Sequence, residues 1–183
     1  MINVYCDVDG IFNAYNSKSP AAATGWTGEW LPMTIPGAYP GQWSRELVAA
    51  INELAAMSGV IWKWLTSWEH EAPLQLAPAI GLDAGQWQVI TGVEYDAFWD
   101  WWKLDRIKKD VEATSPDRFI WIDDDIDFDP SALKWLRGMG NRALRICPKT
   151  IHGLTTAHLD EISTFVGGRS HASIAETALA PGF

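Results

Sequence analysis

Cysteine, basic residues and long apolar runs are all scarce in this sequence of 183 residues. The two cysteines, Cys6 and Cys147, lie in separate apolar runs, which favours buried free thiols over a disulfide framework. No apolar run approaches membrane-spanning length and no secretory signal is visible, so we expect a cytoplasmic protein. With 14 Lys and Arg against 23 Asp and Glu, the net charge of −9 argues against broad, non-specific binding of nucleic acid.

Short apolar runs alternate with segments of helical spacing along the chain. The strand-like runs cover residues 2–6, 60–65, 87–90, 119–122 and 143–146. This alternation predicts an α/β fold, with a Rossmann-like, doubly wound parallel sheet of about five strands and helices on both faces. We expect one domain over residues 1–166 and a loosely held C-terminal tail over 167–183, where Gly, Ser and Pro recur.

Capping residues delimit the expected helices. Ser44 is a candidate N-cap for a helix that Gly59 closes, and Thr155 for a last helix that reaches Val166. A further helix is expected over 69–80, with Pro73 in its first turn. Two more helices are expected, one stopped by Ser115-Pro116 and one opened by Asp129-Pro130.

Polar residues stand where the expected strands end. Asp7 and Asp9 follow the first strand, Thr66 follows the second, and Asp123 and Asp124 follow the fourth. In an open parallel sheet, ligands bind beyond the carboxyl ends of the strands, so we expect these side chains to converge. Converging carboxylates repel unless a proton or a cation intervenes, and Mg²⁺ is the usual cation beside phosphates.

An EF-hand is the alternative for the acidic run that begins at Asp123. The alternation of acidic residues from Asp125 onward suits one, but Pro130 stands where the loop needs glycine and Leu136 where it needs glutamate. The EF-hand is therefore rejected.

Asp7-Val8-Asp9-Gly10 after an apolar strand resembles the first motif of the haloacid dehalogenase (HAD) superfamily. Thr66, Lys103 and the pair Asp123-Asp124 follow in the order of the remaining motifs, and the resemblance spans Ile2 to Val166. The stretches 64–71 and 153–155 are also similar to an actinobacterial and phage branch that resembles the HAD domains of RNA-repair proteins.

The resemblance implies a phosphatase with a covalent intermediate. Asp7 would attack phosphorus, and Asp9 would protonate the leaving oxygen and then activate water. Thr66 would donate a hydrogen bond to a phosphoryl oxygen, and Lys103 would neutralise the developing charge. Lys108 remains a competing candidate for this lysine.

The resemblance also implies a metal site and substrate contacts. Mg²⁺ would be held by the carboxylates of Asp7 and Asp123 and by the backbone carbonyl of Asp9, and Asp124 would bind the ion or a water that coordinates it. Gly10, which lets the backbone pass close to a phosphate, and Ser67 are expected to bind substrate.

The segment 14–42 is the one sizeable insertion near the strand ends, and no room remains for a large cap domain. We expect it to form a flap, with a hairpin that pairs 26–30 with 33–35. Trp26 and Trp30 on this flap could either stack on a substrate or pack onto the domain. An open site suits a large phosphorylated substrate such as a nucleic-acid end, although a small molecule also fits this interpretation.

Two rival functions were weighed. A response-regulator receiver also combines an acidic pair, a Thr or Ser and a Lys, but its acidic pair follows the first strand and its lysine comes near the end. The order found here excludes that class. The second rival is a catalytically inactive HAD-fold binding module that engages a protein partner, and the presence of Asp7, Asp9, Thr66 and Asp123 argues against it.

Overall fold

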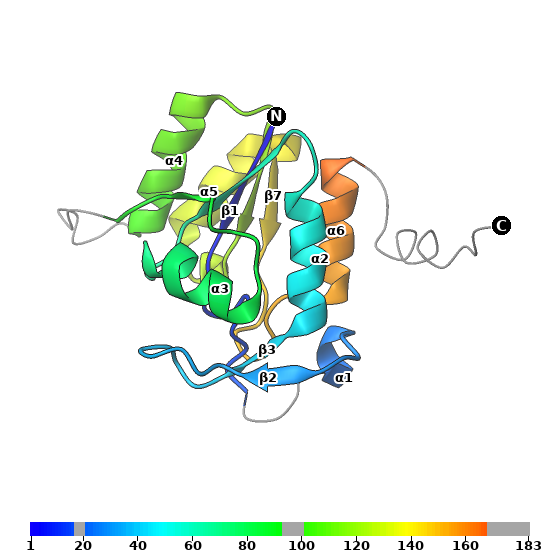
Figure 1. Ribbon diagram of the computed structural model, residues 1–183. Coiled ribbons are helices and arrows are strands. Elements are labelled where there is room, and N and C mark those ends of the chain that lie inside the picture. Colours follow the sequence, from blue (N-terminus) through cyan, green and yellow to red (C-terminus); the bar gives the residue numbers. More distant parts are fainter. Residues whose placement is uncertain (17–20, 93–100, 168–183) are drawn as a thin grey trace.

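Five parallel strands form the central sheet in the computed structural model, which describes residues 1–16, 21–92 and 101–167 (Figure 1). The strands are β1 (Ile2–Cys6), β4 (Val60–Trp64), β5 (Gln88–Val89), β6 (Arg118–Ile122) and β7 (Ala143–Ile146). Their order is β5-β4-β1-β6-β7, so β1 lies at the centre between β4 and β6. The predicted α/β fold with a five-stranded parallel sheet is confirmed.

Helices cover both faces of this sheet. On one face lie α2 (Arg45–Ala55) and α6 (Thr156–Val166), and on the other lie α4 (Trp102–Thr114) and α5 (Pro130–Met139). Alternate residues of β1 serve the two faces, because Val4 and Cys6 join the first core and Tyr5 joins the second. A strand covered on both sides is mostly apolar, and all five residues of β1 are buried. The exception is Asn3, whose amide donates to the hydroxyls of Tyr5 and Thr114.

The predicted helix caps are present. The Ser44 hydroxyl accepts a hydrogen bond from the Leu47 N–H of α2 at 3.3 Å, and Thr155 and His158 form a reciprocal capping box on α6. Asp129 caps α5 in the same way. The expected end of α2 was wrong, because the helix stops at Ala55 and Gly59, at φ 82°, lies in the turn before β4.

The helix expected over 69–80 is interrupted. A π-helical turn occupies Ala72–Leu76 and a short α3 (Ala77–Ile80) follows it. Proline inside a helix lacks an N–H and its ring clashes with the carbonyl four residues earlier. Pro78 stands at such a position relative to Leu74, and the wider π turn accommodates it.

The insertion after β1 differs from the expected hairpin. It contains a short α1 (Ala21–Thr24) and a hairpin that pairs β2 (Trp30–Pro32) with β3 (Gln42–Ser44), so the predicted pairing of 26–30 with 33–35 was wrong. Gln42 is also held by a bridge to Ala14, which sets the register of β3. Figure 1 shows the hairpin beyond the carboxyl ends of the sheet strands.

No separate cap domain lies within the part of the chain that the structure describes, as expected. Of the helices in the described ranges, none has the length and apolar character needed to cross a membrane. Of the expected tail, residues 168–183 lie outside the described residues.

Candidate active site

Polar residues at the carboxyl ends of three adjacent strands define the site. Asp7 directly follows β1 and Asp123 directly follows β6, while Thr66 lies two residues beyond β4. The ladder continues past the strand ends, because the Asp7 N–H donates to the Ile122 carbonyl at 3.0 Å. The backbones that carry these side chains are therefore held together by the sheet itself.

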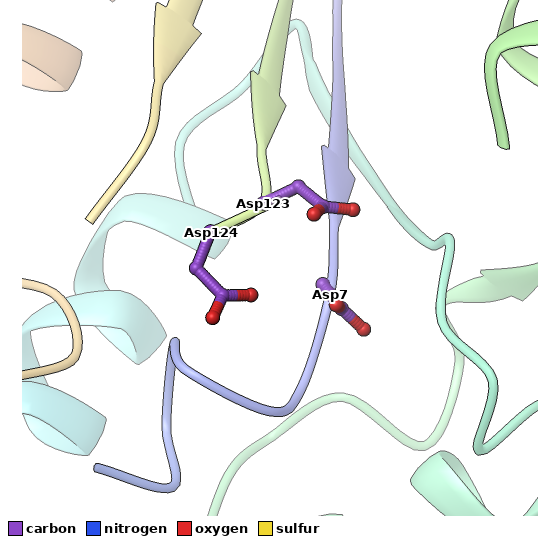
Figure 2. Close-up of side chains that lie close together, drawn as sticks. All are labelled: Asp7, Asp123 and Asp124. Atoms are coloured by element: carbon purple, nitrogen blue, oxygen red, sulfur yellow. The ribbon is translucent and has the colours of Figure 1, made fainter. Parts of the chain in front are cut away.

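Three carboxylates meet at this edge. One oxygen each from Asp7, Asp123 and Asp124 lies within 4.8 Å of the others, and all three residues are buried (Figure 2). Three buried carboxylate oxygens are the ligands that a hard divalent cation such as Mg²⁺ prefers. The residues present therefore fit the metal that the resemblance implied.

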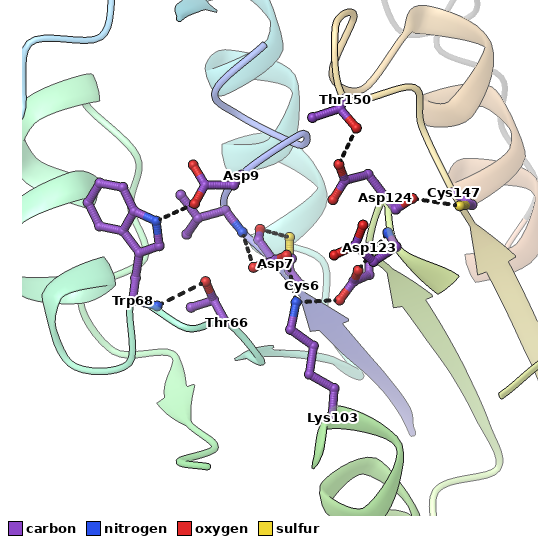
Figure 3. A network of polar contacts seen from close by, with 12 residues as sticks. Cys6, Asp7, Asp9, Thr66, Trp68, Lys103, Asp123, Asp124, Cys147 and Thr150 are labelled. Carbon is purple, nitrogen blue, oxygen red and sulfur yellow. Dashed lines mark hydrogen bonds and ion pairs between the residues drawn. The ribbon is translucent and has the colours of Figure 1, made fainter. Parts of the chain in front are cut away.

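Lys103 bridges two of these carboxylates. Its ammonium lies 2.6 Å from Asp7 Oδ2 and 2.7 Å from Asp123 Oδ2 (Figure 3). Burial alone would lower the pKa of Lys103, but the charges of Asp7 and Asp123 outweigh it and raise the pKa. Lys103 is the second residue of α4 and is buried, whereas Lys108 is exposed on the same helix. Lys103, and not Lys108, therefore belongs to the carboxylate cluster.

The acidic pair after β6 is protonated more easily than ordinary aspartates. Burial, followed by the charge of Asp7, raises the pKa of Asp123 to about 7. Burial raises the pKa of Asp124 to about 6, although a hydrogen bond from Thr150 Oγ1 at 2.5 Å opposes the shift. Groups that release protons near neutral pH can exchange them for a cation.

Gly10 makes room for Asp124. Its φ of 66° lies in the left-handed region, and a Cβ at this position would stand 2.1 Å from Asp124 Oδ2. The glycine of the first motif is thus required by the approach of a carboxylate from β6. That Gly10 also lets the backbone pass close to a phosphate stays a prediction.

Asp9 points away from the other carboxylates. Its Oδ2 accepts a hydrogen bond from the Trp68 indole N–H at 2.8 Å, and its Oδ1 accepts one from Asn13 Nδ2 at 3.3 Å (Figure 3). Its side chain is therefore not part of the carboxylate cluster. That Asp9 offers a metal its backbone carbonyl stays a prediction.

Thr66 and Ser67 lie in the turn after β4, directly before Trp68. The Thr66 hydroxyl oxygen accepts a hydrogen bond from the Trp68 backbone N–H at 3.3 Å, which leaves its proton available for donation. Ser67 is exposed and lines a pocket beside Asp9. The other residues that line this pocket are Gly37, Tyr39, Trp68 and Glu71.

The flap tryptophans are not in the pocket. Trp26 is 3% exposed, and its indole N–H donates to the Leu154 carbonyl at 2.7 Å. Trp30 packs against the same core. The hypothesis that Trp26 and Trp30 stack on a substrate is therefore wrong for the buried Trp26, and packing is the role that the structure favours for both.

Sequence reasoning missed three residues of the site. Asn13 donates hydrogen bonds to Asp9 and to the Tyr39 carbonyl, the latter at 2.9 Å. Tyr39 is 64% exposed at the pocket, and the Thr150 hydroxyl donates to Asp124. Asn13 could have been predicted as a partner of Asp9, because it lies only four residues after it. Tyr39 and Thr150 lie in loops whose path no periodicity in the sequence predicts.

No curated protein and no solved structure matches the chain. A family described as the HAD domain in Swiss Army Knife RNA repair proteins matches residues 3–159, a range that includes every candidate site residue. This match agrees with the sheet order and with the motif order along the chain. Across most of its length, therefore, the chain belongs to the HAD superfamily and, within it, to the family of HAD domains of Swiss Army Knife RNA repair proteins.

Proposed function

We propose that the protein is a Mg²⁺-dependent phosphatase that hydrolyses phosphoric monoesters through an aspartyl-phosphate on Asp7. Membership of the HAD superfamily suggests phosphohydrolase chemistry in general. The single observation that supports this function best is the buried Asp7 carboxylate, which is paired with Lys103 and adjoins Asp123 and Asp124. A carboxylate that attacks phosphorus needs positive charge beside it, because the phosphoryl group brings further negative charge, and Lys103 supplies part of that charge.

In the first step, a carboxylate oxygen of Asp7 forms a bond to phosphorus as the bond from phosphorus to the leaving oxygen breaks. The electron pair of the broken bond goes to the leaving oxygen, which takes a proton from the Asp9 carboxyl. The Thr66 hydroxyl donates to a phosphoryl oxygen, and Lys103 offsets the charge shared by Asp7 and the phosphoryl group. The alcohol product then leaves and Asp9 is a carboxylate.

In the second step, a water molecule attacks phosphorus. Asp9 takes the proton of this water, the bond from phosphorus to Asp7 breaks, and inorganic phosphate forms with Asp7 regenerated as a carboxylate. Asp9 lies apart from the carboxylate cluster, and Lys103 pairs with Asp7 and not with Asp9. The Asp9 carboxyl group can therefore exchange protons in both steps.

Mg²⁺ would be held by the carboxylates of Asp7, Asp123 and Asp124 and by the Asp9 carbonyl. When bound there, it supplies positive charge that stabilises the oxygens of the transferring phosphoryl group.

The substrate class that we propose is a phosphorylated nucleic-acid end or nucleotide. The family description names RNA repair proteins. The pocket beside Asp9 is bordered by loop residues such as Gly37 and Tyr39 and not by a cap domain, which suits a substrate whose bulk remains outside. An inactive binding module has less support, because the nucleophile, acid, threonine and lysine of the motifs are all present at one edge of the sheet.

Turnover of p-nitrophenyl phosphate with Mg²⁺ tests the proposed function. Asp7→Asn removes the nucleophilic charge, and we expect turnover to fall by at least about 10³-fold. Asp105→Asn is the matched control, because Asp105 lies on the exposed side of α4 in an ion pair with Lys109. Turnover that survives in Asp7→Asn, or a wild-type protein inactive on all phosphate monoesters including oligonucleotide ends, contradicts the proposal.

A further inference from the structure

The contact between Trp68 and Asp9 has a consequence for catalysis. We infer that Trp68 is a positioning residue, whose indole N–H holds the Asp9 carboxyl at the side of the site where the leaving group departs. The inference rests on the proposed phosphatase function and assigns a role to a residue outside the motifs.

Trp68 is the closer of two side chains that donate hydrogen bonds to Asp9. The indole N–H lies 2.8 Å from Oδ2, whereas Asn13 lies 3.3 Å from Oδ1. The Asn13 amide also donates to the Tyr39 carbonyl at 2.9 Å, so its direction is set by the flap loop as well. Tyr15 is a further neighbour, because burial and then the charge of Asp9 raise the pKa of its phenol. Trp68 therefore constrains Asp9 more than Asn13 does.

Trp68 is itself fixed by the turn after β4. Its backbone N–H donates to the Thr66 hydroxyl at 3.3 Å, and its carbonyl accepts from the Glu71 N–H at 2.9 Å. Glu69, in the middle of this turn, has a φ of 43° and accepts a hydrogen bond from the Gly92 N–H at 3.0 Å. A residue in the left-handed region persists only where its surroundings hold it, so this turn is a rigid support.

One side chain thus connects two motif residues from different strands. Thr66 follows β4 and Asp9 follows β1, and Trp68 binds the first through its backbone and the second through its indole (Figure 3). Trp68 therefore links the Thr66 hydroxyl directly to the acid. Proton transfer demands such control, because a misplacement of about 1 Å can cost roughly 10²-fold in rate.

The pocket that Trp68 lines indicates on which side of the site this residue acts. Trp68 and Asp9 line the same pocket with Tyr39 and Ser67, and the carboxylate cluster lies apart from it. A phosphoryl group between Asp7 and Thr66 would direct its leaving oxygen toward this pocket. Trp68 then acts on the leaving group through Asp9 and does not touch the metal ligands.

The leaving group provides the test. In Trp68→Phe, we expect the kcat/KM for an alkyl phosphate, which reports the first step and needs the leaving oxygen protonated, to fall by about 10- to 100-fold. For p-nitrophenyl phosphate, whose leaving group departs as an anion, the kcat/KM should stay within about threefold of wild type, although kcat can fall for both substrates because Asp9 also serves the second step. The matched control is Trp135→Phe, because Trp135 stacks on Phe119 on the other face of the sheet.

A second measurement does not depend on turnover. The indole N–H signal that disappears in Trp68→Phe identifies Trp68 in a ¹⁵N-edited NMR spectrum, and Asp9→Ala should shift this signal. Equal losses of kcat/KM for both substrates, unchanged kinetics, or an unshifted signal would overturn the role of Trp68. If the proposed phosphatase function itself is wrong, the result is different, because the wild-type protein then hydrolyses neither substrate. The positioning role of Trp68 is then wrong as well, even if the indole signal shifts.

Discussion

At the scale of single residues, Gly10 offers the sharpest prediction. In Gly10→Ala, the new methyl group must displace the Asp124 carboxylate, whose Oδ2 stands 2.1 Å from the site of the Cβ. We expect weaker Mg²⁺ binding and a fall in turnover of at least about tenfold, together with about 1–3 kcal/mol of lost stability from the positive φ. Steady-state kinetics over a Mg²⁺ titration and urea unfolding measure the two effects separately.

Gly81 provides the control for this substitution. Its φ of 76° is similar, but a Cβ there would meet nothing within 4 Å. Gly81→Ala therefore carries the conformational strain without the crowding, and it should lose stability while keeping its turnover. If both variants lose turnover equally, strain and not displacement of Asp124 is the cause.

The identities of the site residues could be predicted from the sequence, but their directions could not. Asp7, Thr66 and Asp123 follow apolar runs that had to be strands, so their convergence followed from the parallel sheet alone. The direction of Asp9 depends on Trp68 and Asn13, which are hydrogen-bond partners that no spacing rule selects. For the same reason, a pocket residue such as Tyr39 emerges only from the path of a loop.

At the scale of elements, the capping box of α6 predicts a dependence of stability on pH. The Thr155 N–H donates to Nδ1 of His158 at 3.1 Å, which requires an unprotonated ring nitrogen. Burial lowers the pKa of His158. The unfolded chain therefore binds the proton more tightly, so the stability is complete above the ordinary histidine pKa of about 6.5 and is lost as the pH falls below it.

His158→Gln separates this effect from general acid denaturation. Glutamine also serves at the third helical position of a capping box, and it does not titrate. Between pH 7.5 and 5.5, the urea midpoint of wild type should fall further than that of the variant. Parallel slopes for the two proteins would contradict the role of His158.

The two elements that differ from expectation have different causes. The segment after Thr66 has an apolar pattern of helical type, but Pro78 cannot continue a regular α-helix and a π turn precedes it, which is a local cause. In the insertion, the apolar residues around Trp26 and Met33 predict paired strands. Instead, Trp26 binds the Leu154 carbonyl, and Leu31 pairs with Trp43. Register of this kind depends on contacts distant in sequence.

At the scale of the whole molecule, Mg²⁺ should stabilise the fold. Three buried carboxylates lie together and a single ammonium group pairs with two of them, in a chain with a net charge of −9, so a bound cation relieves repulsion in the native state only. At about 100 times its dissociation constant, a ligand of the native state adds about 2.7 kcal/mol, which corresponds to roughly 5–10 °C in Tm for a domain of this size.

Thermal unfolding with Mg²⁺ and with NaCl at equal ionic strength measures this stabilisation. Asp123→Asn should lose most of the increase, whereas Asp105→Asn, on the exposed face of α4, should keep it. An increase that NaCl reproduces, or one that survives in Asp123→Asn, would show that Mg²⁺ does not bind between these carboxylates.

The β2–β3 hairpin is joined to the domain in a way that leaves little freedom. Ser44 ends β3 and also caps α2, and the backbones of Ala14 and Gln42 exchange hydrogen bonds of 2.8 and 2.9 Å. The hairpin whose loop carries Tyr39 is therefore anchored to the domain at its base and forms a rim of the pocket. Substrates reach the pocket past this rim. On the proposed function, a long polymer could present its phosphorylated end while the remainder of its chain stays in water.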